Sequence, residues 1–247
     1  MTMQTSATLA LNEAVRARWA RGETVYHLGF GESRFPVHPA LLEELRRHAG
    51  RKEYPPVQGL PALREAIAGY YRRALGLEVD PGQVVVGPGS KILLWAMLQA
   101  LPGDLILPRP SWVSYAPQAR LTGKAVAWAA ADPARDYVPT GAQLAAAAEE
   151  LRARGASPGV VIFNTPNNPT GVVYPEAAVA ELAAAAREQG LALISDELYC
   201  FVGHGRRPHA SFAAADPERA VITGGLSKHL SLGGWRLGFA ILPRGPW

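Results

Sequence analysis

Short apolar runs alternate with longer amphipathic or alanine-rich segments along most of the chain. The apolar runs are bounded by Gly, Pro or Asn, which is typical of buried strands. They predict strands over 83–86, 104–107, 124–129, 160–163, 191–195, 220–223 and 237–242. The segments between them predict helices over 91–100, 141–154 and 175–189. Near-continuous apolar strands that alternate with helices indicate an α/β protein, a three-layer α/β/α sandwich around a mostly parallel seven-stranded sheet.

The first eighty residues follow a different pattern. They predict helices over 9–19, 40–48 and 60–75, separated by an irregular glycine-rich stretch over 29–39 and by two consecutive prolines, Pro55 and Pro56. We therefore expect an N-terminal arm that wraps around the main domain.

Composition narrows the class of protein. The 247 residues are 48% hydrophobic and 19% charged, which suits a large buried core rather than a disordered chain. The net charge of +4 is spread without a basic cluster, so we expect no nucleic-acid partner, and no apolar stretch approaches the length of a membrane span. Cys200 is the only cysteine, and the first ten residues lack a signal-peptide pattern. Both features favour a reducing cytoplasm as the location.

Metal and hydrolase chemistry are not indicated. The six histidines form no His-Glu-x-x-His pattern, and there is no second cysteine to help bind zinc. The sequence contains neither a serine-nucleophile elbow nor a Walker-type loop. Candidate chemistry lies instead in polar segments that follow the predicted strands, where ligands gather in sheets of this kind.

Two of these segments suit a phosphate. Residues 87–91 follow the first strand and open a helix, so free backbone N–H groups and the Ser90 hydroxyl can hold an anion, although glycines in such turns also serve geometry alone. Lys228 follows a later strand, and Arg236 comes eight positions after it. A lysine at the end of a strand, with an anion-binding arginine nearby, suits a Schiff base to a phosphorylated aldehyde cofactor, although an isolated lysine is usually a surface charge.

Two further segments have both a structural and a chemical interpretation. Asp196 ends a buried strand and needs a partner, which a protonated pyridine nitrogen would provide, but aspartate is equally common as the cap of a turn. Residues 164–171 contain Asn-Pro and Thr-Gly pairs, which form turns, yet the polar string is long for a turn alone.

Together these runs resemble the motifs of class I/II aminotransferases, which are fold-type I pyridoxal-phosphate enzymes. The lysine run 224–238 and the Asn-Pro-Thr-Gly string at 168–171 carry the resemblance, which extends over about 28–242. It implies that Lys228 is the Schiff-base lysine, that Asp196 contacts the pyridine nitrogen, and that Tyr199 shares the phenolic oxygen with Asn168. The remaining cofactor contacts that it implies are Trp112 over the ring and Gly89, Ser90, Lys91, Ser227 and Arg236 around the cofactor and its phosphate.

Two softer matches concern the N-terminal segment. The run 28–32 resembles the family's glycine strip, which would place Gly31 beside the substrate carboxylate. The run 54–60 resembles the segment whose tyrosine reaches the phosphate of the neighbouring subunit, so that Tyr54 would act across a homodimer. Gly225 departs from the serine that many relatives have three residues before the lysine.

The resemblance implies a domain organisation and an activity. We expect an N-terminal arm with part of a small domain over 1–45, a large pyridoxal-phosphate-binding domain over 46–247, and no C-terminal small domain in this chain. Relatives supply the arginine for the substrate carboxylate from that domain, so we expect weak activity or none. The expected function is an aminotransferase that moves an amino group between an amino acid and a 2-oxo acid. A C–S lyase or related elimination enzyme, and a truncated non-catalytic remnant, are the alternatives.

Overall fold

A seven-stranded sheet forms the centre of the protein. The computed structural model describes residues 7–29, 31–203 and 209–245. The strand order is β1-β7-β6-β5-β4-β2-β3, and every neighbouring pair is parallel except the two that β7 forms with β1 and β6. The strands are β1 (Val84–Gly87), β2 (Asp104–Arg109), β3 (Val126–Ala130), β4 (Pro158–Asn164), β5 (Ala192–Asp196), β6 (Ala220–Gly225) and β7 (Gly238–Ile241). The predicted mostly parallel sheet is confirmed.

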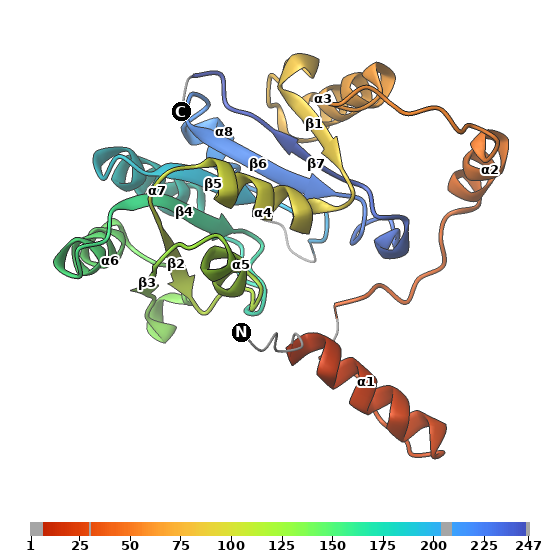
Figure 1. The fold of residues 1–247 in the computed structure, drawn as a ribbon, viewed down its shortest axis with the longest axis horizontal. Helices are drawn as coiled ribbons and strands as arrows, with labels where there is room; N and C mark the ends of the chain where they lie inside the picture. Colours follow the sequence, from red (N-terminus) through yellow and green to blue (C-terminus); the bar gives the residue numbers. More distant parts are fainter. Residues whose placement is uncertain (1–6, 30, 204–208, 246–247) are drawn as a thin grey trace.

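Helices cover both faces of the sheet, so the predicted three layers are also confirmed (Figure 1). Successive side chains of a strand point to opposite faces, and the strands here are apolar on both. Leu105 and Ile162 pack with α4 and α5 on one face, whereas Ile106 and Phe163 pack with α6, α7 and α8 on the other. Helix α3 covers the β1, β6 and β7 side of that second face. The helices are α3 (Pro61–Leu75), α4 (Ser90–Ala100), α5 (Tyr115–Leu121), α6 (Gly141–Ala153), α7 (Glu176–Glu188) and α8 (Phe212–Ala215).

Local signals explain where the long helices begin and why some short elements were missed. Thr140 caps α6 through a capping box with Gln143, and α7 starts directly after Pro175. Helices α5 and α8 were not predicted, because seven and four residues are too few to show a helical period. The same holds for the three-residue 3₁₀ turns η1 (Pro81–Gln83), η2 (Pro133–Arg135) and η3 (Gly233–Trp235).

The N-terminal segment extends beyond the three layers. Helices α1 (Ala7–Ala20) and α2 (Pro39–His48) lie away from the sheet, and only α3 packs on it (Figure 1). Helix α2 buries no residue, and apolar side chains such as Leu28 and Phe35 are exposed, so this part of the arm does not wrap around the main domain as expected. None of the described helices is long and apolar enough to cross a membrane.

Candidate active site

The strand register brings the predicted segments to one edge of the sheet. Strands β1, β2, β4, β5 and β6 run in the same direction, so their carboxyl ends meet there. Asp196 pairs with Asn164 of β4 and with Thr223 of β6. Strand β7 runs the opposite way, and Gly238 pairs with the last residues of both β1 and β6. Arg236, which precedes β7, therefore lies between the turn after β1 and the turn after β6.

Asp196 is a buried carboxylate with a short hydrogen bond. Its side chain is 4% exposed, and Oδ2 accepts a hydrogen bond from the Tyr115 hydroxyl at 2.5 Å. The Leu198 N–H lies 3.3 Å from Oδ1. Burial raises the pKa of Asp196 above its ordinary value, while the hydrogen bond from Tyr115 acts in the opposite direction. The carboxylate is thus buried and hydrogen-bonded, and it has no ion-pair partner among the described residues.

Asn164 organises the two segments on either side of it. Its Nδ2 donates to the Asp196 carbonyl oxygen at 2.7 Å, and its Oδ1 accepts from the Asn168 backbone N–H at 2.7 Å. The Asn168 side chain donates in turn to the Tyr199 hydroxyl at 3.3 Å. Burial is the main reason that the pKa of Tyr199 is raised. Asn168 and Tyr199 therefore present their polar groups together.

The Lys228 amine lies at the same edge. Its Nζ donates a hydrogen bond to the carbonyl oxygen of Gly31 and lies 5.6 Å from the centre of the Tyr199 ring. Burial lowers the pKa of Lys228, and the charge of Arg236 acts in the same direction. Glu32 and Asp196 oppose this shift. A lysine whose pKa is lowered in this way is better suited to nucleophilic and proton-transfer chemistry than an exposed one.

A positively charged cradle lies at the start of α4. Gly89 is the N-cap residue, has φ of 96° and provides no side-chain cap, so the first N–H groups of the helix have no side-chain acceptor there. A Cβ at Gly89 would collide with the Arg236 guanidinium, which donates to the Gly233 carbonyl oxygen at 2.7 Å. The pKa of Lys91 is lowered, first by burial and then by Arg236. No carboxylate pairs with either cation among the described residues, so the cradle suits a phosphate.

Of the remaining predicted residues, Trp112, Ser90 and Ser227 lie near the carboxyl-end edge of the sheet, and Tyr54 does not. Trp112 packs edge-on against Tyr115, with 5.2 Å between ring centres, and the Lys91 amine lies 5.0 Å from the Trp112 ring centre. Ser90 lies just after the end of β1 and Ser227 just after the end of β6, where both strands pair with Gly238 of β7. Tyr54 is fully exposed in the connection between α2 and α3 and contacts none of these groups.

Sequence reasoning missed the roles of Tyr115 and Asn164. A polar residue at the last position of an apolar strand was a usable signal for Asn164. Tyr115 gave no such signal, because its contact with Asp196 joins positions 81 residues apart.

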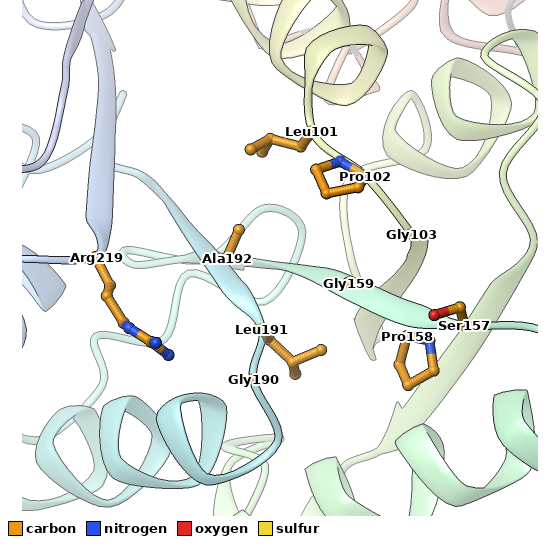
Figure 2. Close-up of a pocket in the computed structure, with 10 residues that line it drawn as sticks. All are labelled: Leu101, Pro102, Gly103, Ser157, Pro158, Gly159, Gly190, Leu191, Ala192 and Arg219. Carbon is orange, nitrogen blue, oxygen red and sulfur yellow. The ribbon is translucent and has the colours of Figure 1, made fainter. Parts of the chain in front are cut away.

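A cavity of about 260 Å³ lies at the opposite edge of the sheet. It is bordered by the segments that lead into β2, β4 and β5, with Arg219 at one side (Figure 2). None of the residues predicted to carry chemistry contributes to it, so the cradle and the buried carboxylate, rather than this cavity, define the candidate site.

The fold and this edge define an α/β protein with a positively charged cradle and a half-buried lysine at the carboxyl ends of its parallel strands. Residues 23–244 match the aminotransferase class I and II family, and the chain therefore belongs to it. The aspartate aminotransferase of Geobacillus stearothermophilus is 34% identical over 97% of this chain and 61% of its own length. A probable aspartate/prephenate aminotransferase of Thermus aquaticus is 35% identical over 98% of this chain and 63% of its own.

The solved structures agree with this assignment. The aspartate aminotransferase of Thermus thermophilus, solved with maleate, has a TM-score of 0.90 to this chain at 34% identity and matches 98% of it. The match covers 63% of that structure. The chain thus spans about three fifths of the length of these relatives.

Proposed function

We propose that the protein catalyses pyridoxal-phosphate-dependent transfer of an amino group between an amino acid and a 2-oxo acid. The observation that carries the proposal is the meeting of three features at one sheet edge. These are the half-buried Lys228 amine, the buried Asp196 carboxylate, and the cradle at Gly89 and Arg236. They match the aldehyde, the pyridine nitrogen and the phosphate of that cofactor in chemistry and in number.

Each group has a role in binding the cofactor. The α4 N-terminus at Gly89, with Ser90, Lys91 and Arg236, would hold the phosphate, because N–H groups and a guanidinium fork suit its oxygens. Asp196 would accept a hydrogen bond from the pyridine nitrogen. In this proposal Asn168 and Tyr199 would contact the phenolic oxygen of the cofactor, and Trp112 would contact its ring face. Ser227, in the turn after β6, would be a further contact.

Bound pyridoxal phosphate supplies an electron sink that makes the Cα proton of an attached amino acid acidic. Asp196 would keep that sink effective, because its carboxylate would stabilise a proton on the ring nitrogen. Lys228 Nζ would bind the cofactor at rest, then remove the proton from the substrate Cα and return it later in the reaction. Burial and Arg236 favour the neutral amine that this step needs, because both lower the pKa of Lys228. Gly31 lies next to Nζ, where a substrate carboxylate would approach.

The substrates and the assembly are part of the same proposal. Aspartate is the amino donor in the names of the relatives, so it is the first donor to test, with 2-oxo acids as acceptors. We propose a homodimer in which Tyr54 reaches the phosphate of the neighbouring subunit. Its full exposure here, and the exposed apolar residues of the arm, support that arrangement. In this proposal residues 46–247 form the cofactor domain and 1–45 the arm with part of a small domain, in a cytoplasmic enzyme.

Covalent labelling tests the proposal. The chain is incubated with pyridoxal phosphate, reduced with borohydride and mapped by peptide mass. We expect the label on Lys228 and not on the other lysines, which are Lys52, Lys91 and Lys124. An absorbance band that persists in Lys228→Ala at the same intensity, or a label spread evenly over the lysines, would refute it.

A product assay defines the reaction. Aspartate and a 2-oxo acid should yield a new amino acid in equal amount to the oxo acid formed from aspartate. Release of thiol or ammonia from a sulfur-containing amino acid, without amino-group transfer, would identify an elimination enzyme instead.

A further inference from the structure

A second buried carboxylate follows Asp196 directly, and the mechanism above does not use it. Glu197 is 1% exposed. Its Oε1 accepts hydrogen bonds from the Ser195 hydroxyl at 2.8 Å and from the Ser211 hydroxyl at 2.5 Å. Its backbone N–H donates to the Thr223 carbonyl oxygen at 2.9 Å. Glu197 therefore joins the end of β5 to β6 and to the segment that leads into α8.

His209 faces the other oxygen of this carboxylate. Its side chain is 3% exposed, and Nε2 lies 3.1 Å from Glu197 Oε2. The contact lacks the alignment of a hydrogen bond, and neither ring nitrogen of His209 has a hydrogen-bond partner among the described residues. A buried carboxylate without a counter-charge is strongly unfavourable. The ring of His209 is the group that the fold places against Glu197 Oε2.

The surroundings of Glu197 offer no other cation among the described residues. The titratable groups that face it are Asp196, Tyr71 of α3 and Cys200. The pKa of Tyr71 and that of Cys200 are raised, first by burial, so both side chains are neutral. The charge of Glu197 also raises the pKa of Asp196. Without a partner, Glu197 would therefore work against the ionised state that Asp196 needs.

We propose that Glu197 and His209 form a buried ion pair that positions Asp196 and cancels the negative charge beside it. The inference rests on the proposed function, because it gives the pair a role at the cofactor's ring nitrogen. Both residues are positioning residues, since neither reaches the reacting atoms. Through Ser195 the pair holds the chain before Asp196, and through Ser211, which caps α8, it anchors the segment that returns to β6.

Stability measurements without cofactor test the ion pair itself. Glu197→Gln keeps the shape and one oxygen acceptor, and His209→Gln keeps a polar side chain. Each single variant leaves one buried charge unpaired, so both should unfold at lower urea concentration than the wild type. The double variant should be more stable than either single variant, because it leaves no charge behind. Additive losses in the double variant would overturn the ion pair.

A cofactor spectrum tests the effect on the site. The visible absorbance band of the bound cofactor changes with pH, and its midpoint reports how readily the cofactor site accepts a positive charge. Removing the negative charge with Glu197→Gln should lower this midpoint, and removing the positive charge with His209→Gln should raise it, each by roughly half a unit to one unit. The double variant should return close to the wild-type midpoint. The other charged or titratable groups near Lys228 stay in place in all variants, and these are Glu32, Asp196, Tyr199 and Arg236.

Arg187 and Asp216 provide a matched control. Asp216 is buried, follows α8 directly and pairs with Arg187 at 2.7 Å, but it contacts neither Glu197 nor Asp196. Arg187→Gln and Asp216→Asn should lower stability without moving the absorbance midpoint. Equal midpoints in all variants, or shifts of the same sign in the Glu197 and His209 variants, would overturn the role of the pair while leaving the proposed function intact. Failure of the wild type to bind cofactor would instead overturn the proposed function, and the urea measurements would still judge the ion pair.

Discussion

Replacing Tyr115 by phenylalanine tests the role of Tyr115 at Asp196 with little change in packing. The tyrosine is 1% exposed, and its hydroxyl donates to Asp196 Oδ2 at 2.5 Å. The phenylalanine ring keeps the contact with Trp112. A hydrogen bond to a charged group contributes about 1.5–3 kcal/mol, so Tyr115→Phe should lower the free energy of unfolding by about 2 kcal/mol at neutral pH.

The loss should depend on pH in a defined direction. Burial raises the pKa of Asp196, but the Tyr115 hydroxyl lowers it and so stabilises the folded carboxylate. The stabilisation by this hydrogen bond is present where Asp196 is ionised and is lost as the pH falls and Asp196 binds a proton. The difference in unfolding free energy between wild type and variant should therefore be larger at about pH 8 than at about pH 4.

Urea unfolding of the cofactor-free chain measures this difference, with Tyr174→Phe as the matched control. Tyr174 is equally buried, and its hydroxyl has no hydrogen-bond partner among the described residues. Its replacement should change stability by less than about 0.5 kcal/mol at either pH. If the two variants lost the same stability at neutral pH, or if the Tyr115 variant lost more at low pH, the reasoning about Asp196 would be wrong.

Two further predictions concern the cofactor groups. Arg236→Ala should raise the dissociation constant for pyridoxal phosphate about 10- to 100-fold with little loss of fold, because a charge-assisted phosphate contact is removed. Arg109→Ala, which removes an arginine packed on a tryptophan at the same edge, should leave it unchanged. Asp196→Asn should slow amino transfer sharply yet stabilise the cofactor-free chain at about pH 8 relative to the wild type. Burial raises the pKa of Asp196, so the folded wild type binds this proton more tightly than the unfolded chain. The stability that comes from the net shift is therefore full at low pH, and the wild type loses it as the pH rises. Thermal midpoints at about pH 5 and pH 8 check this prediction. A variant whose thermal midpoint falls as steeply between these two pH values as that of the wild type would contradict it.

Local pattern was sufficient to locate most elements. The seven strands lie within two residues of the predicted ranges, because a buried strand needs a continuous apolar run and a polar or glycine stop. The long helices α4, α6 and α7 were predicted from the longer amphipathic or alanine-rich segments between these runs. The position of the polar segments after the strands was also readable, because parallel strands place their carboxyl ends at one edge.

The sequence by itself determined which residues are candidates for the chemistry, since Lys228, Asp196, Asn168 and Arg236 stand at strand ends in recognisable runs. Only the tertiary structure decided their partners. The insertion of β7 between β1 and β6 brings Arg236 against Gly89, and the fold joins Lys228 to Gly31 across 197 positions. Likewise, the contact between Glu197 and His209 depends on where the segment after β5 returns to the sheet. Such contacts depend on register and on which faces pack together, and neither leaves a local signal in the chain.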